Sequence, residues 1–173
     1  VRYSPSQYTF PSYAPHIDMQ EVAAGWARSI QVVDSIPLFV EAGAELKYTF
    51  TPKEDEHAQA KYSLLTFRVP VNVTYKLYLS STRNIALAPY AGIHFRAIAM
   101  GKEKVNGKGE NIFEDNRKNQ TSCKWYRCQL GWQVGIRLQL ERYFIAASYG
   151  RDFPDKKKCP QIHECGLSAG FCF

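Results

Sequence analysis

The sequence has no apolar run that approaches the length of a membrane-spanning helix. A helix needs about 20 consecutive apolar residues to cross a bilayer, and the mean hydropathy of this chain is only −0.35. The composition therefore argues against a transmembrane helix. It leaves a transmembrane β-barrel open, because the strands of such a barrel alternate polar and apolar residues and escape a hydropathy window.

Motifs for metal or cofactor binding are also missing. The four histidines have no metal-ligand spacing, and the five cysteines contain no Cys-x-x-Cys pair. No phosphate-binding glycine loop is present, because Gly101, Gly107 and Gly109 lie among lysines in a predicted surface loop. We expect no metal, no cofactor and no enzymatic activity.

The charge is not strongly of one sign. The formal net charge is +6, and basic residues gather in 102–118 and 156–158. Both stretches are predicted loops, so solvated loop charge explains them better than nucleic-acid binding. The chain begins without Met or an apolar signal segment, and we expect a leader to have been removed. Its 173 residues predict a single domain, 1–173.

What the sequence does have is a regular alternation of apolar with polar or small residues. In 124–140 the even positions are mostly aliphatic or aromatic, and the odd positions are mostly Gln, Gly or Arg. Successive side chains of a strand point to opposite faces, so this period of two predicts a strand rather than a helix. Similar patterns predict strands over 19–33, 36–50, 62–79, 84–101, 142–153 and 165–173. Residues 1–18 are expected to hold only a weak first strand and a loop, because Pro5 interrupts the strand.

The predicted connections alternate in length. Short turns fall at 34–35, 80–83 and 141–142, and longer loops fall at 11–18, 51–61, 102–123 and 154–161. Tight turns at one end and long loops at the other are typical of outer-membrane barrels. We therefore predict an all-β fold, an eight-stranded antiparallel up-and-down transmembrane β-barrel.

Side-chain size indicates which face is outward. The polar face carries glycines such as Gly92, Gly131 and Gly135, and the apolar face carries Trp26 and Trp132. The interior of an eight-stranded barrel is only just wide enough to be filled by side chains, so small residues suit the inside. In a membrane, the opposite phase would expose several arginines to lipid, at roughly 2–4 kcal/mol each near the midplane.

The inward polar phase supplies the candidate site, a lumen charge network. Its predicted members are Glu41, Glu45, Lys47, Arg68, Lys76, His94, Arg96, Arg127, Arg137 and Glu164. Buried charges have to be paired, so we expect ion pairs that plug the lumen. A narrow ion path is one alternative. Another is a hydrolytic group formed by His94, a nearby inward acid and Ser148 or Ser168.

Cysteines and aromatic residues give two further predictions. Cys123 and Cys159 fall in neighbouring long loops, which predicts a disulfide in an oxidising compartment. Aromatic residues near both ends of the strands predict two interfacial girdles. The members are Tyr48, Phe50, Trp125 and Tyr126 at the loop ends, and Phe39, Tyr143, Phe171 and Phe173 at the turn ends.

Four stretches, "IPLFVEAGAELKYTF", "FRVPVNVTYKLYL", "IALAPYAGIHFRAIAMGK" and "CGLSAGFCF", resemble the outer-membrane β-barrel domain family of Bacteroidetes-type bacteria. The resemblance covers 19–173, and the five cysteines and the weak first strand depart from it. It implies an integral barrel in the bacterial outer membrane, surrounded by lipid, with a mostly uncharacterised role. It also implies that Phe171 and Phe173 belong to a terminal signal read by the barrel-assembly machinery.

These patterns predict a structural or surface-interaction protein of the outer membrane. Recognition of an extracellular ligand would lie in the long basic loop 102–123, because loops on a rigid scaffold carry recognition. The alternatives are a soluble barrel that holds a lipid on an inward apolar face, a small outer-membrane enzyme and a narrow channel.

Overall fold

The computed structural model describes residues 1–9, 17–52, 60–82, 84–105, 108–113, 125–153 and 160–172. Within them, ten strands form one antiparallel sheet. The strands are β1 (Arg2–Thr9), β2 (Ile17–Val33), β3 (Ile36–Phe50), β4 (Ala60–Tyr75), β5 (Leu77–Tyr78), β6 (Ile85–Val105), β7 (Lys108–Asn111), β8 (Cys128–Leu140), β9 (Tyr143–Asp152) and β10 (Gln161–Phe171). The described part of the chain contains no helix that could span a membrane.

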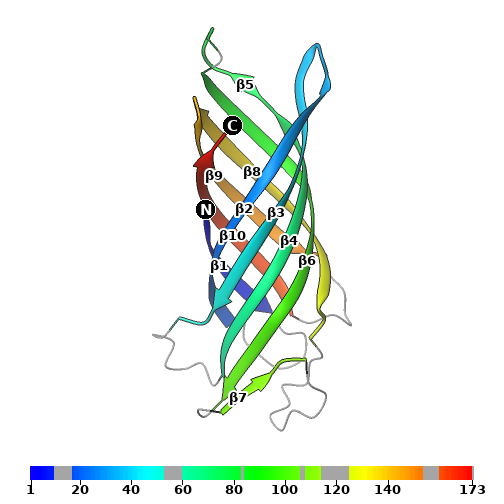
Figure 1. Cartoon of the computed structure of the whole chain (residues 1–173), viewed down its shortest axis with the longest axis vertical. Coiled ribbons are helices and arrows are strands. Elements are labelled where there is room, and N and C mark those ends of the chain that lie inside the picture. Colours follow the sequence, from blue (N-terminus) through cyan, green and yellow to red (C-terminus); the bar gives the residue numbers. More distant parts are fainter. Residues whose placement is uncertain are drawn as a thin grey trace.

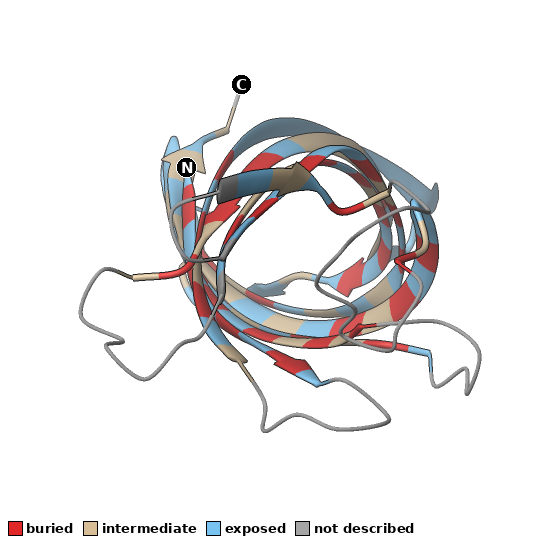
Figure 2. Ribbon diagram, turned by 90° about the horizontal axis from the view of Figure 1, so that it is seen from below, coloured by how far each residue is buried: buried red, intermediate tan, exposed pale blue. Residues whose placement is uncertain are grey.

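The sheet closes on itself. The long strands pair in the cycle β1–β2–β3–β4–β6–β8–β9–β10, and β10 pairs in turn with β1. Among the described residues, the short strands β5 and β7 each pair only with β6. Figure 1 shows the strands inclined to the long axis, and Figure 2 shows them as a ring around that axis. The prediction of an all-β, antiparallel up-and-down fold is confirmed.

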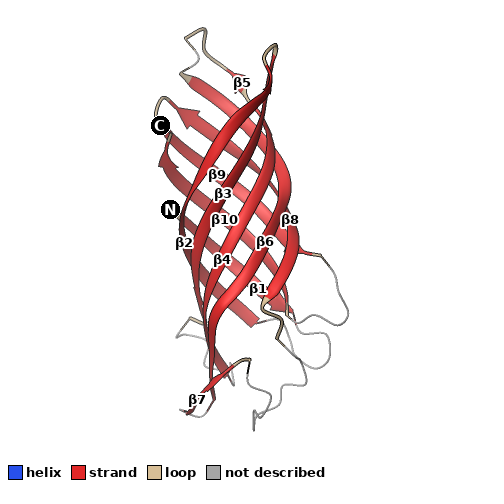
Figure 3. Cartoon of the chain, turned by 45° about the vertical axis from the view of Figure 1, so that its right-hand side comes forward, coloured by secondary structure: helices blue, strands red, loops and turns tan. Residues whose placement is uncertain are grey.

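The strand boundaries follow the alternating segments of the sequence. The predicted turns at 34–35 and 141–142 separate β2 from β3 and β8 from β9. We call the end of the barrel with these turns the turn end, and the opposite end the loop end (Figure 3). Both described termini of the ring, the start of β1 and the end of β10, lie toward the turn end.

The weakly predicted first strand is a full member of the ring. Pro5 pairs with Gln20 of β2, while the pairing of β1 with β10 is interrupted between Tyr3 and Ser6. Proline lacks the N–H that a strand donates, so this interruption lets β1 accommodate Pro5.

The outside of the barrel is apolar and the inside is polar. Along β1, buried and exposed residues alternate without a break. Among the described residues, 32 large apolar side chains are exposed, whereas 12 apolar and 19 polar or charged residues are buried. A soluble protein buries mostly apolar residues. The alternative of a soluble barrel with an apolar lumen is therefore wrong.

A β-bulge changes the phase of β6 at Ala99. Leu65 of β4 pairs with Met100, but the next residue, Thr66, pairs with Ile98, which leaves Ala99 as an extra residue. A single inserted residue moves all following side chains to the opposite face.

Beyond the bulge, β6 continues to Val105 and pairs with β7. The first part of the segment predicted as a loop, 102–123, is therefore a strand pair, whereas 114–123 lies outside the described residues. The prediction was wrong here because the alternation reverses at the bulge, so the outer half of β6 does not continue the pattern of its inner half.

An apolar cluster fills the lumen at the loop end. Its buried members are Tyr8, Met19, Tyr62, Leu64, Ile98, Ile112, Trp125 and Ile162. The ring centroid of Trp125 lies 6.4 Å from that of Tyr8 and 5.6 Å from that of Tyr62. The prediction of Trp125 as a girdle residue was wrong. Trp125 lies before β8, which begins at Cys128, so the alternation of that strand does not fix its side chain, and its ring packs among apolar partners inside the lumen.

Candidate functional site

Charged side chains line the lumen between the apolar cluster and the turn end. Five cations and five carboxylates form ion pairs there, so their formal charges cancel. These ten residues, which we call the lumen network, are Arg2, Lys47, Arg68, Arg96, Arg137, Glu21, Glu41, Glu45, Asp152 and Glu164.

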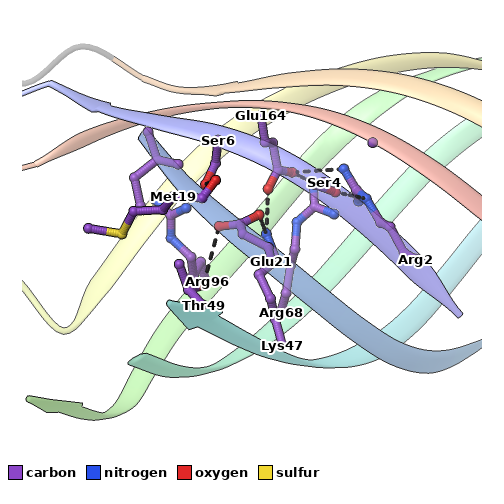
Figure 4. A network of polar contacts seen from close by, with 12 residues as sticks. Arg2, Ser4, Ser6, Met19, Glu21, Lys47, Thr49, Arg68, Arg96 and Glu164 are labelled. Atoms are coloured by element: carbon purple, nitrogen blue, oxygen red, sulfur yellow. Dashed lines mark hydrogen bonds and ion pairs between the residues drawn. The ribbon is translucent and has the colours of Figure 1, made fainter. Parts of the chain in front are cut away.

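Glu164 of β10 is the centre of the lumen network. Its Oε1 forms an ion pair with Nη2 of Arg68 at 2.7 Å and accepts a hydrogen bond from Nη2 of Arg2 at 3.1 Å, and its Oε2 accepts from Nζ of Lys47. The same Nζ donates to Oε2 of Glu21 at 2.9 Å. Figure 4 shows these side chains converging from β1, β2, β3, β4 and β10. Three cations thus hold one carboxylate, which the near-complete burial of Glu164 would otherwise make costly.

His94 of β6 joins two parts of the lumen network. Its Nδ1 accepts from Nη2 of Arg68 at 3.1 Å, because a guanidinium can only donate. Its Nε2 lies 3.8 Å from Oδ1 of Asp152, whose other oxygen accepts from Arg96. This arrangement assigns the proton of a neutral imidazole to Nε2. A Cβ at position 131 would lie 2.5 Å from that nitrogen, so Gly131 makes room for the ring.

The geometry does not support the hydrolytic alternative. Both ring nitrogens of His94 face members of the lumen network, and none of the described serines hydrogen-bonds to it. Ser148 instead donates from Oγ to the carbonyl of Gly166 at 3.4 Å. Ser168 lines the cavity at the turn end.

The lumen opens into a cavity of about 510 Å³ at the turn end. Arg137 of β8 and Glu41 of β3 meet in its wall through two hydrogen bonds. The guanidinium carbon of Arg137 lies 5.7 Å from the ring centroid of Tyr90 and 5.1 Å from that of Phe144. Aromatic contacts of this kind attract the cation and fix its position beside Glu41.

Two predicted members lie apart from the lumen network. Lys76 lines the turn-end cavity, and its Nζ lies 4.4 Å from the ring centroid of Phe39. Arg127 is exposed and stacks over Phe113 at 4.1 Å, so its prediction as a lumen charge was wrong. The reason is that β8 begins at Cys128, and the alternation of that strand does not fix the side chain before it.

Three members of the lumen network were not predicted from the sequence: Arg2, Glu21 and Asp152. Glu21 and Asp152 occupy the inward phase of segments predicted as strands, and this phase was the signal that could have found them. Arg2 belongs to the weakly predicted first strand. The cross-lumen partners depend on how the strands are staggered around the ring, which one sequence does not reveal.

The described cysteines carry free thiols. Cys128 and Cys165 are exposed on the outer face, and Cys172 is half-buried. The predicted disulfide of Cys123 with Cys159 and the predicted terminal signal at Phe173 lie outside the described residues. Phe171 is exposed at the turn end, with its ring centroid 5.1 Å from that of Tyr143.

The chemistry of the site is that of charge compensation. Every cation of the lumen network contacts a carboxylate of the same network. In the described part of the chain, no three histidine, cysteine or acidic side chains are grouped so that they could hold a metal ion.

No family model and no curated protein matches this chain. Neisserial surface protein A is similar in structure, with a TM-score of 0.51 and 9% identity over 97% of this chain and 91% of that chain. Two structures of Ail of Yersinia pestis have TM-scores of 0.49 and 0.48 at 13% and 12% identity, each covering 98% of this chain and 93% of that chain. The outer membrane enzyme PagL has a TM-score of 0.49 at 12% identity, covering 98% of each chain. At these identities the structural similarity shows only the fold. The chain has the fold of a small outer-membrane β-barrel.

Proposed function

We propose that this protein is an integral outer-membrane barrel of eight long strands with a plugged lumen. Its role is structural or one of surface interaction rather than enzymatic. The observation that carries the proposal is the inversion of its faces, with large apolar side chains outside and paired charges inside. In water, an apolar surface of this extent would drive aggregation. In lipid it is stable, and a closed ring leaves no strand edge without hydrogen bonds.

The lumen is plugged in two layers. The lumen network forms the first layer, in which Arg68, Lys47 and Glu164 are 0–3% exposed. The apolar cluster around Trp125 forms the second layer at the loop end. An ion would have to separate the buried pairs and then cross the apolar layer without its water, which supports a barrel without steady conductance.

The surface-interaction role rests on the outer part of β4 and β6. Lys61 lies directly opposite Lys104, and Lys102 projects from the same exposed face. Like charges directly opposite each other destabilise a sheet, so an anionic extracellular ligand is favoured there. Lys102 and Lys104 belong to the predicted recognition segment 102–123.

Two finer statements belong to the same proposal. One is membership of the Bacteroidetes-type barrel family, which rests on the four sequence stretches quoted above. The other is that the barrel-assembly machinery reads β10. This strand closes the ring against β1 and carries the exposed ring of Phe171.

Cell fractionation and gel mobility test the proposal. We expect the protein in the outer-membrane fraction, extracted only by detergent, with a gel mobility that changes on heating as the closed barrel unfolds. In planar bilayers we expect no steady single-channel current. A protein that stays monodisperse in buffer without detergent would overturn the membrane assignment, and a steady current would overturn the plugged lumen.

A further inference from the structure

An arginine stands in the apolar outer wall near the loop end. Arg151 of β9 lies in the outward phase between Tyr149 and Phe153, which are 38% and 47% exposed. Trp132 of β8 is its cross-strand neighbour. Arg151 forms no ion pair with any described residue, and its Nε is buried without a hydrogen-bond partner. A cation in this position needs an anion from outside the chain.

A second donor lies directly beside this arginine. His163 of β10 pairs with Arg151 in the register and shares its outward face. The Nδ1 of His163 lies 3.3 Å from the hydroxyl oxygen of Tyr149. With that hydroxyl donating to Nδ1, the proton of the imidazole is on Nε2, which can donate to a ligand. The acid nearest in this row of cross-strand pairs, Asp18, lies on β2, two strands from His163.

A groove of about 580 Å³ begins at His163 on the outer surface. Gln7 of β1, the partner of His163, and Asp18 of β2, the partner of Gln7, line its loop-end side. Farther toward the turn end its lining is mainly apolar, with Cys165, Pro5 and Tyr3 beside Gln20. The groove is therefore polar, with one acid, at the side where the membrane surface would lie, and mainly apolar toward the membrane interior.

This order of polarity matches a lipid rather than a soluble anion. We propose that Arg151 and His163 bind the phosphate of a membrane lipid, and that one acyl chain of this lipid lies in the groove. The inference rests on the proposed membrane location. A phosphate accepts charge-assisted hydrogen bonds from arginine and supplies the missing counter-charge. It also removes the cost of an arginine facing lipid, which in barrels is lower near the interface than at the midplane.

Native mass spectrometry of the detergent-solubilised protein tests this site. The probes are phosphatidylglycerol, diacylglycerol with the same acyl chains, and glycerol 3-phosphate. We expect the intact protein to retain phosphatidylglycerol in preference to both other probes. Arg151→Gln should weaken phosphatidylglycerol binding about tenfold, since a hydrogen bond to a charged group is lost. His163→Gln should weaken it less, and Cys165→Trp should weaken it by filling the groove.

The matched control is Arg28→Gln, which removes an exposed arginine of β2 near the turn end. It should leave phosphatidylglycerol binding unchanged. Equal weakening in Arg28→Gln and Arg151→Gln, or equal retention of all three probes, would overturn the inference. Heat-dependent gel mobility of each variant shows that the barrel is folded. If the barrel is folded and needs detergent but retains phosphatidylglycerol no better than diacylglycerol, only this inference is contradicted. If the protein is soluble without detergent, the proposed function is contradicted.

Discussion

Arg137 of β8 donates to both carboxylate oxygens of Glu41 on β3, at 2.9 Å each, although β4 and β6 separate these two strands in the ring. The pair therefore joins parts of the barrel wall that no backbone pairing connects. Two parallel N–H···O bonds to one carboxylate are a property of the guanidinium group that lysine cannot reproduce.

The first prediction concerns this pair. Its side chains are 18% and 4% exposed, so the turn-end cavity partly hydrates it. We expect Arg137→Gln or Glu41→Gln to lower the free energy of unfolding by about 1–2 kcal/mol, less than for a fully buried pair. The double variant should be more stable than the sum of the single losses predicts. Urea unfolding of the barrel in lipid vesicles measures this cycle, and strictly additive losses would mean that the two groups do not interact.

The second prediction concerns Arg68, whose side chain is fully buried. It contacts Glu164 at 2.7 Å, Gln133 at 2.5 Å and Glu45 at 3.0 Å. Arg68→Met leaves Gln133 Oε1 without its donor and removes one cation each from Glu164 and Glu45 in the middle of the lumen. We expect a loss of about 3–5 kcal/mol in the free energy of unfolding.

The comparison variant for Arg68 is Arg28→Met, which removes an exposed arginine and should change the free energy of unfolding by less than about 0.5 kcal/mol. If Arg68→Met is too unstable for titration, the yield of heat-modifiable barrel gives the same ranking. Equal stability of the two variants would contradict the central place of Arg68 in the lumen network.

The third prediction concerns the close approach of β6 to the apolar cluster. A Cβ at position 101 would lie 2.2 Å from Cδ1 of Ile112 and 2.9 Å from Cδ2 of Leu64. Gly101→Ala should therefore destabilise the barrel by about 1–3 kcal/mol, the range for overpacked cores. Ile112→Ala removes the nearer clash, so Gly101→Ala should cost much less in that background. An unchanged cost, measured by the same unfolding experiment, would show that Ile112 does not pack over Gly101.

The ring of strands could be predicted because its cause is local. A period of two that persists through β3, β4, β8 and β9 has one structural meaning, and the turn residues between β2 and β3 mark the boundary directly. The inward phase also followed from local features, because glycines and charges share one face while tryptophans such as Trp26 lie on the other.

The predictions that were wrong or missing concern features that depend on the whole ring of strands. The bulge at Ala99 is defined by the pairing of β6 with β4, so it cannot be predicted from the sequence of β6 alone. The partner of Arg137 is Glu41 because of the stagger between strands that lie apart in the ring. Trp125 was misplaced because an aromatic residue near a strand end suits an interfacial girdle and a lumen plug equally well. Only its neighbours Tyr8 and Tyr62 decide between these positions.

The last prediction tests the inversion of faces through the three tryptophans. Trp26 is 70% exposed on the outer face and Trp125 is 4% exposed inside the lumen. Trp132 is half-buried on the outer face, with its ring centroid 5.7 Å from that of Tyr149. Three variants, each keeping one tryptophan and carrying Phe at the other two positions, are refolded into vesicles of brominated phosphatidylcholine. Bromine quenches fluorescence on contact, so Trp26 and Trp132 should be strongly quenched and Trp125 should keep most of its emission. Vesicles without bromine supply the reference intensity for each variant. Quenching of Trp125 as strong as that of Trp26 would place both rings in lipid, which the buried apolar cluster at the loop end does not allow.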